Sequence, residues 1–247
     1  LIRRQRQMCI RDRFNSDQIQ KIGKEISSKV DGKTLFDEFS RGRYSTDASV
    51  YQIKPLGVVL PKDTNDVLSL MEYSQKNSVP LLARGGGSSQ CGQTVGESVV
   101  LDYSKHQNKI LELNVEEKYV WVQPGVVLDH LNAYLKPHGL WFPVDVSTSS
   151  RATIGGMSAN NSCGSRSLYY GNMVHNVLAI EAILDDGSIF NFDQINKNYL
   201  ATKNNQDRLY KIIDKFIDVR QQVGGEIDAN WPTTQRRVGG YNIDLID

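Results

Sequence analysis

Three consecutive glycines, Gly85–Gly87, set the tightest limit on the fold of this 247-residue chain. They stand in the segment Arg84–Ser89, directly after an apolar run at residues 79–83 that we expect to be a buried strand. Because glycine has no Cβ, such a loop can adopt positive φ and turn several N–H groups toward one point. This suits a phosphate or pyrophosphate, to which Ser88 and Ser89 add hydroxyl groups. A plain flexible turn would explain the glycines about as well.

The loop matches neither of two common nucleotide-binding motifs. It lacks the lysine and the spacing of GxxxxGK[ST], and it lacks the GxGxxG spacing of a Rossmann loop. A second cluster, Thr153–Gly156, leads into the small residues 158–164. A flat ligand could lie against such backbone, with amides reaching its polar edge. A glycine-tolerant surface loop is the alternative, although long loops such as 147–171 are uncommon in compact domains unless they are functional.

Hydrophobic periodicity and turn residues predict an α+β fold. A βαβ start is followed by strands that favour antiparallel pairing, with few helices between them. Asp63 and Asp66 stand in capping-box spacing at the start of one helix. We expect helices at residues 16–30, 63–76, 126–135 and 207–223, strands at 57–60, 79–83 and 98–101, hairpins at 109–123 and 176–192, and a loop at 40–52.

Composition excludes several classes of function. The 29 basic and 28 acidic residues leave a net charge of +1, so neither nucleic acid nor an anionic membrane is expected as the main partner. No apolar run approaches the ~20 residues of a transmembrane helix. Three scattered cysteines, Cys9, Cys91 and Cys163, support no disulfide framework, zinc site or iron–sulfur cluster. We expect free thiols and a cytoplasmic location, either soluble or peripheral to the inner face of a membrane.

The remaining polar candidates favour structural roles. None of the four histidines has metal-ligand spacing to other donors, so no metal site is expected. Tyr44 and Tyr51 are expected to anchor the loop that precedes the domain. Arg236 and Arg237 could pair with a substrate carboxylate, although a solvated charge pair is the preferred interpretation. The histidines, which we expect to be structural or solvated, are His106, His130, His138 and His175.

Five motifs in a fixed order identify a family. They are R-GGG-S-S at residues 84–89, V-x-V-x-P-G at 120–125, T-I-G-G at 153–156, Y-G at 170–171 and D-G at 186–187. Over residues 55–192 the chain resembles the PCMH-type FAD-binding domain of the vanillyl-alcohol oxidase superfamily. This resemblance implies two α+β subdomains with FAD between them.

The flanks narrow the resemblance. Residues 42–55, GRYSTDASVYQIKP, look like the start of the FAD-linked D-2-hydroxy-acid dehydrogenase branch, which includes relatives of D-lactate, glycolate and D-2-hydroxyglutarate dehydrogenases. Residues 237–242 resemble the xSGYxL loop of that branch, with Gly239 in place of the usual Ser or Thr.

The resemblance also implies cofactor contacts. In the family, the loop matching 84–89 wraps the FAD pyrophosphate, 143–164 lies along the isoalloxazine and ribityl chain, and 170–180 runs near the adenosine. Ser88 stands where covalent-flavin members carry histidine, so we expect non-covalent FAD. Gly86 is expected to need positive φ or a Cβ-free approach to the ligand, in a loop outside the core. The implied cofactor-binding residues are Arg84, Gly85, Gly86, Gly87, Ser88, Ser89, Pro124, Gly125, Pro143, Thr153, Gly155, Gly156, Asn160, Gly164 and Gly171.

The expected domain organisation is that of a C-terminally truncated fragment. Residues 1–13 resemble translated sequencing-adapter sequence, a non-native tail. Residues 14–52 form an N-terminal helix and a loop that leads into the domain. The FAD-binding domain spans 53–247, with subdomains at about 53–105 and 106–247. The substrate domain, which in relatives holds the catalytic base and any metal or iron–sulfur ligands, is absent, so no catalytic residue is assigned.

The implied reaction is oxidation of a D-2-hydroxy acid to a 2-keto acid, with hydride transfer to flavin N5. A quinone, a cytochrome or an electron-transfer protein would accept the electrons. Two alternatives stay open: an FAD-dependent oxidase of sugars, aldonolactones or alcohols on the same fold, and a non-catalytic FAD-binding subunit.

Overall fold

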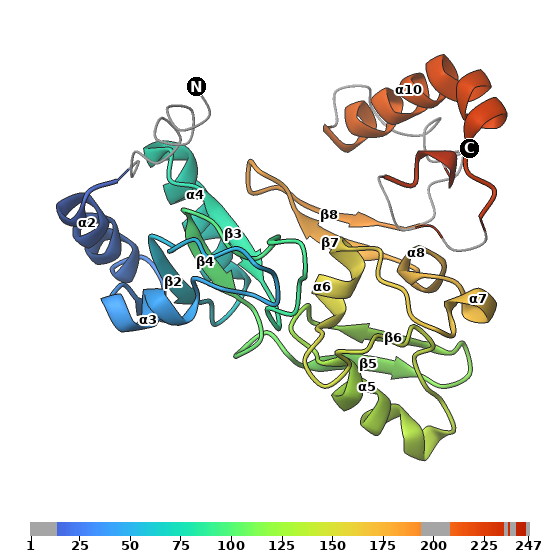
Figure 1. Ribbon diagram of the computed structural model, residues 1–247, viewed down its shortest axis with the longest axis horizontal. Helices are drawn as coiled ribbons and strands as arrows, with labels where there is room; N and C mark the ends of the chain where they lie inside the picture. The colour runs from blue at the N-terminus through green and yellow to red at the C-terminus, as the bar shows by residue number, and fades with distance from the viewer. Residues whose placement is uncertain (1–13, 194–207, 235–236, 238–240, 246–247) are drawn as a thin grey trace. The chain divides into compact units, whose positions relative to one another are not determined.

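The computed structural model describes residues 14–193, 208–234, 237 and 241–245, which form two compact units (Figure 1). Unit 1 contains the described residues up to Phe142, together with Ser147–Met157 and Asp185–Gly187. Unit 2 contains Pro143–Val146, Ser158–Leu184 and the described residues from Ser188 onward. The expected tail at 1–13 lies outside the described residues, and the expected domain and subdomain boundaries stay predictions.

A four-stranded sheet in unit 1 has the order β1-β2-β4-β3. β2 (Gly57–Leu60), β4 (Val99–Asp102) and β3 (Leu81–Arg84) run parallel, and β1 (Lys33–Leu35) joins the edge antiparallel to β2. Strands at these three positions were expected, but the parallel pairing of β4 was not, and the three-residue β1 is too short to give a periodic signal. β3 is an edge strand with Ala83 exposed, so the expectation of a buried strand at residues 79–83 is wrong, whereas all four residues of β4 are buried.

Three helices accompany this sheet. α2 (Ser16–Ser27) neighbours β1, α3 (Glu38–Arg43) neighbours β2, and α4 (Thr64–Asn77) connects β2 to β3. α3 lies partly within the predicted loop at 40–52, and Asp37 caps it. Asp63 caps α4 as expected, but Asp66 does not complete a capping box. Its carboxylate accepts instead from the amides of residues 31, 32 and 62, because these turns converge on it.

A second hydrophobic cluster in unit 1 holds the predicted hairpin against a helix. β5 (Ile110–Asn114) pairs with β6 (Tyr119–Val122), and α5 (Leu128–Leu135) continues into the short 3-10 helix η1 (Lys136–His138). Leu131 and Leu135 on α5 are buried against apolar side chains of the hairpin. The 3.6-residue spacing of the apolar positions explains why one face of α5 is buried.

The stretch predicted as a loop at 147–171 contains two helices, α6 (Ile154–Ala159) and α7 (Ser167–Tyr170). Helix propensity argues against α6, because two of its six residues are glycine. Packing outweighs propensity here: a Cβ on Gly155 would lie 2.6 Å from Cβ of Pro124, and Met157 is buried. The absent side chains let α6 approach the residues that follow β6.

Unit 2 contains the second predicted hairpin. β7 (Ile180–Ile183) pairs with β8 (Ile189–Phe192), and α8 (Met173–Asn176) precedes them. The last helix, α10 (Arg208–Asn230), runs past the predicted end at residue 223, and η2 (Ile243–Leu245) follows it. The helix passes through Gly224–Gly225 because neither glycine takes positive φ and Ile227 beyond them is buried.

Candidate functional site

The three glycines follow β3 and pack closely against other parts of unit 1. A Cβ on Gly85 would lie 2.1 Å from Oγ1 of Thr153, and one on Gly86 would lie 2.1 Å from the carbonyl oxygen of Arg151. Positive φ occurs at Gly87, where it is +65°, and not at Gly86 as expected. Gly86 thus needs a Cβ-free approach, but to protein backbone. The structure therefore brings the two predicted glycine clusters together.

The backbone amides of the loop are available to a ligand. Among the residues that the structure describes, no protein group accepts a hydrogen bond from the N–H groups of Gly85, Gly86, Gly87 or Ser88. Gly86 is exposed, and the other three residues are half-buried. Four consecutive free donors at a glycine-rich turn form a site for an anion with several acceptor oxygens.

The Arg84 side chain is engaged with the protein itself. Its guanidinium donates to the carbonyl oxygens of Tyr44, Thr46 and Thr94, over distances from 2.8 to 3.4 Å. It lies over the Tyr44 ring, 5.2 Å from the ring centroid. A Cβ on Gly87 would lie 2.5 Å from Nη2 of Arg84, so the guanidinium also packs against the loop. Burial lowers the pKa of Arg84, partly offset by the nearby Asp102 carboxylate.

A buried hydrogen bond joins Tyr44 to the end of β4, one of the two interior strands of the sheet. The Tyr44 hydroxyl donates to Oδ2 of Asp102 over 2.7 Å, and both residues are buried. Burial, together with this hydrogen bond, raises the pKa of Tyr44 well above its usual value. The other oxygen of Asp102 accepts from the amide and hydroxyl of Ser104. Tyr44 thus acts as the expected anchor, whereas sequence reasoning missed Asp102, whose only signal was a carboxylate ending a buried strand.

Further contacts join residues 92–94, in the connection between β3 and β4, to residues 47–51. Asp47 accepts from the amide and hydroxyl of Thr94, at 3.4 and 3.1 Å. A Cβ on Gly92, which has a φ of +72°, would lie 2.6 Å from the Tyr51 ring, so this tyrosine packs against the loop as its predicted anchoring role requires. Desolvation opposes ionisation of Asp47, but hydrogen bonds from Ser49 and Thr94 outweigh it and lower the pKa of this carboxyl.

The second glycine cluster differs from the first because its amides are used. Ile154 donates to the Val126 carbonyl over 2.8 Å and Gly155 to the Pro124 carbonyl over 2.9 Å. Gly156 donates to Oγ1 of the buried Thr153 over 3.4 Å. The expectation that amides here reach a ligand is therefore wrong at residues 154–156. This segment instead offers backbone without side chains.

Pro124 and Gly125 position the second cluster. Gly125 is buried and donates to the carbonyl of Gln107 over 2.8 Å, and a Cβ there would lie 2.1 Å from the carbonyl oxygen of Tyr103. Burial raises the pKa of Tyr103 to about 12. The exposed Pro124 packs against Gly155. Within unit 1, Pro124 thus packs against the second cluster at Gly155, and Thr153 of that cluster packs against the glycine loop at Gly85.

The other predicted site residues lie in unit 2. Pro143 and Gly164 are half-buried, whereas Asn160 is exposed. A Cβ on Gly164 would overlap the Asp145 carbonyl oxygen, 1.3 Å away, so the backbones meet there. Gly171, with a φ of +78°, ends α7. Although desolvation opposes it, hydrogen bonds from Ser165 and the Arg166 amide lower the pKa of Asp145.

Polar contacts attach the last described residues to unit 2. Arg237 pairs with Asp244 over 2.5 Å and lies over the Trp231 ring, so it is not a free clamp for a substrate carboxylate. The buried Asn172 donates to the Arg237 carbonyl over 2.6 Å. Arg236 and Gly239, which also belong to the sequence interpretation, lie outside the described residues.

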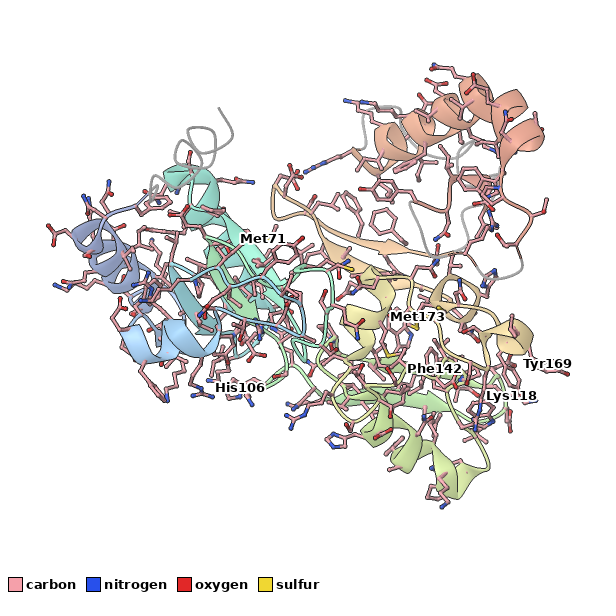
Figure 2. The ribbon with its side chains drawn as sticks, in the orientation of Figure 1. Met71, His106, Lys118, Phe142, Tyr169 and Met173 are labelled. Carbon is pink, nitrogen blue, oxygen red and sulfur yellow. The ribbon has the colours of Figure 1, made fainter. Side chains whose placement is uncertain are left out.

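The described residues offer no second site at a histidine or a metal-ligand cluster, and no membrane-spanning helix. All four imidazoles are exposed, as Figure 2 shows for His106 beyond β4. Across residues 14–193 and the later described segments, no cluster of three or more His, Cys, Asp or Glu side chains could hold a metal ion. None of the described helices is both long enough and apolar enough to span a bilayer.

Comparison with known proteins identifies the family. The sequence profile of the FAD binding domain matches residues 55–193, so the chain belongs to the FAD-binding domain family. An alkyldihydroxyacetonephosphate synthase structure is similar with a TM-score of 0.62 and 20% identity, covering 74% of this chain and 36% of that chain. These matches confirm the predicted α+β, PCMH-type FAD-binding fold.

Curated relatives are considerably longer than this chain. A D-2-hydroxyglutarate dehydrogenase from Haemophilus influenzae is 42% identical over 212 residues, which are 82% of this chain and 20% of that protein. The glycolate oxidase subunit GlcD from Bacillus subtilis is 37% identical over 176 residues, 69% of this chain and 37% of the subunit. The chain therefore spans about a fifth of the first relative and just over a third of the second.

Proposed function

We propose that the free amides of Gly85–Ser88 hold the pyrophosphate of FAD. The observation that carries this proposal is the run of four N–H groups, in the described chain, that have no protein acceptor; one of the four belongs to Gly87, which has a positive φ. A pyrophosphate offers several charged acceptor oxygens, and hydrogen bonds to charged groups are the stronger ones. Ser88 adds a hydroxyl group at the end of the same loop, whereas the Ser89 hydroxyl already donates to Oε1 of Gln93 and accepts from the Cys91 amide.

The second cluster would serve the flavin differently. With their amides bonded to protein, Thr153–Gly156 would present flat backbone rather than donors, which suits the face of a rigid ring system. Pro124 and Gly125 would hold that surface in place from the end of β6. Pro143, Asn160, Gly164 and Gly171 stay proposed contacts of the cofactor. Because Ser88 cannot form a histidyl link, the FAD would be non-covalent.

The reaction we propose is oxidation of a D-2-hydroxy acid to the 2-keto acid by a longer protein of which this chain forms the flavin-binding part. FAD, when bound, supplies the hydride acceptor at flavin N5. The residues of this chain would bind and orient the cofactor. The 42% identical relative is named a D-2-hydroxyglutarate dehydrogenase, which makes D-2-hydroxyglutarate the first substrate to test.

The test is anaerobic reduction of the flavin in the full-length protein. D-2-hydroxyglutarate, D-lactate, glycolate, a sugar and an aldonolactone are mixed with it separately, and L-2-hydroxyglutarate is the matched control. We expect a D-2-hydroxy acid to bleach the oxidised-flavin absorption while the L-enantiomer leaves it unchanged. Bleaching by a sugar or aldonolactone alone would support an oxidase on the same fold. No bleaching by any of these would support a non-catalytic subunit.

A further inference from the structure

Residues 44–52, here called the flanking segment, precede the FAD-binding domain match at 55–193 but contact the glycine loop. Tyr44 contributes the ring on which Arg84 lies and, like Thr46, a carbonyl oxygen that the guanidinium binds. Asp47 holds Thr94 on the far side of the same loop. The flanking segment, which lies outside the domain match, therefore contacts the connection between β3 and β4 at both ends, at Arg84 and at Thr94.

The Tyr44 contact is also the more deeply buried of the two. Its hydroxyl donates to Asp102 at the end of β4, while its ring packs into the cluster with Val58 and Val100. Arg84 then connects this fixed ring to the glycines, since its guanidinium lies against Gly87. A displacement of Tyr44 would therefore move Arg84 and the amides that follow it.

The engagement of Arg84 decides its role. Three carbonyl oxygens and one aromatic ring already surround its guanidinium, with the Asp102 carboxylate close enough to raise its pKa against the effect of burial. A guanidinium has five donors in a fixed fork, and this arrangement directs that fork toward the flanking segment and Thr94. The hydrogen bonds of Arg84 are therefore made within the protein, where they position the glycine loop, and are not directed toward the cofactor.

We propose that the flanking segment is part of the cofactor-binding machinery, with Tyr44, Asp47 and Arg84 as positioning residues for the free amides of Gly85–Ser88. This inference rests on the proposed function, because it assumes that these amides bind FAD. Tyr44 fixes one side of the loop through Asp102 and Arg84. Asp47 fixes the other side through Thr94. Arg84 acts on the cofactor through the loop.

Tyr73 provides a matched control for Tyr44. It lies in the same unit, is also buried, and its hydroxyl donates to the Glu25 carboxylate over the same 2.7 Å. The partner of Tyr73, Glu25, lies on α2, whereas the partner of Tyr44, Asp102, is the last residue of β4. Replacing either tyrosine by phenylalanine removes one hydroxyl and one hydrogen bond to a carboxylate. The two variants thus lose the same kind of hydrogen bond, from a buried tyrosine to a carboxylate that is buried at Asp102 and half-buried at Glu25.

The experiment measures FAD affinity of the full-length apo-protein and its Tyr44→Phe and Tyr73→Phe variants by titration, with apo melting curves beside each. We expect Tyr44→Phe to raise the Kd for FAD roughly tenfold, about 1.4 kcal/mol, and Tyr73→Phe to leave it within twofold. Equal Kd values for the Tyr44→Phe variant and the parent would overturn the inference. A parent that does not bind FAD would instead refute the proposed function.

Asp47→Asn keeps the proposal testable if Tyr44→Phe does not fold. Asp47 is half-buried. Asparagine preserves the size of this side chain while weakening the hydrogen bonds that it accepts from Thr94. We expect a severalfold rise in the Kd for FAD with little change in apo melting. An unchanged Kd in a folded Asp47→Asn protein would contradict the positioning role of the flanking segment.

Discussion

The two glycine clusters of unit 1 have similar compositions and opposite backbone states. In Gly85–Gly87 the N–H groups have no acceptor in the described protein, and Gly87 takes positive φ. In Ile154–Gly156 the N–H groups are bonded to the protein, and the residues are helical. Glycine therefore allows close packing in both clusters, but only the first cluster also keeps its N–H groups free of protein acceptors.

The difference follows from what each cluster adjoins. The first leaves an edge strand and turns outward, so its amides face solvent or a ligand. The second begins a helix that packs against Pro124, and its amides point back to residues 124, 126 and 153. A Cβ would be unfavourable in both places, but for different neighbours.

The first prediction concerns how strongly the free amides alone hold the cofactor. Because Ser88 cannot form a histidyl link, we expect FAD to be held by hydrogen bonds and other non-covalent contacts. Acid denaturation should then release all of the FAD, since these contacts are lost with the fold. The measurement is flavin in the supernatant and pellet after acid precipitation of the full-length protein. A pellet that stays yellow and fluorescent would show a covalent link and contradict the role given to this loop.

The second prediction tests the first cluster by substitution. Gly86→Val places a branched side chain 2.1 Å from the Arg151 carbonyl oxygen, so it should displace the loop and remove several hydrogen bonds to the pyrophosphate. We expect FAD affinity to fall at least ~100-fold, with a loss of stability of ~1–3 kcal/mol from overpacking. Titration with FAD and apo melting curves give the two quantities.

Gly42→Ala is the control for this variant. Gly42 lies in α3, and nothing lies within 4 Å of a Cβ built there, so alanine should leave FAD binding unchanged. Parent-like FAD affinity in Gly86→Val would exclude this loop as the phosphate site. The expectation that Gly86 lies in a loop outside the core is corrected here, because Gly86 packs on the backbone of Arg151 and its replacement should therefore also cost stability.

The third prediction separates packing from donor function in the second cluster. Gly155→Ala should destabilise the protein by ~1–3 kcal/mol, because its Cβ would lie 2.6 Å from Pro124. Gly156→Ala should change stability by less than ~1 kcal/mol, because the nearest atom, Oγ1 of Thr153, is 3.1 Å away and alanine favours the helix. Urea unfolding of both variants measures the difference. Equal losses would mean that close packing does not explain this cluster.

The smallest expected effect is pH dependence from two surface carboxyls, Asp47 in unit 1 and Asp145 in unit 2. Hydrogen bonds lower the pKa of each, despite opposing desolvation. Each therefore contributes stability above the unfolded pKa of about 3.9, and this is lost as pH falls through the lower folded pKa. We expect Asp47→Asn and Asp145→Asn to weaken the acid-side loss of stability slightly. Identical unfolding profiles from pH 6 to about pH 3 would contradict this.

Local patterns predicted the elements whose signals are local. The parallel strands, both hairpins and α5 follow from apolar periodicity and from turn residues such as Asp186–Gly187, where Gly187 has a φ of +82°. The position of Asp63 at the start of α4 also follows from a local capping preference. These features need only a few neighbouring residues to specify them.

Contacts between distant segments explain what was missed. Glycine propensity argued against α6, and only the approach to Pro124, some thirty residues earlier, accounts for it. Asp66 has capping spacing, but three amides from other turns bind its carboxylate. Arg84 was grouped with the cofactor ligands by its motif alone, and its carbonyl partners at residues 44, 46 and 94 have no signature in the sequence.

Amide hydrogen exchange of the full-length protein, with and without FAD, tests the central claim most directly. Riboflavin, which lacks the pyrophosphate, is the control ligand. The account predicts that Gly85–Ser88 exchange rapidly in the apo-protein and become protected by FAD but not by riboflavin, whereas Gly155 and Met157 are protected in every state. Bound FAD that leaves exchange at Gly85–Ser88 unchanged would contradict the assignment of the pyrophosphate to these amides.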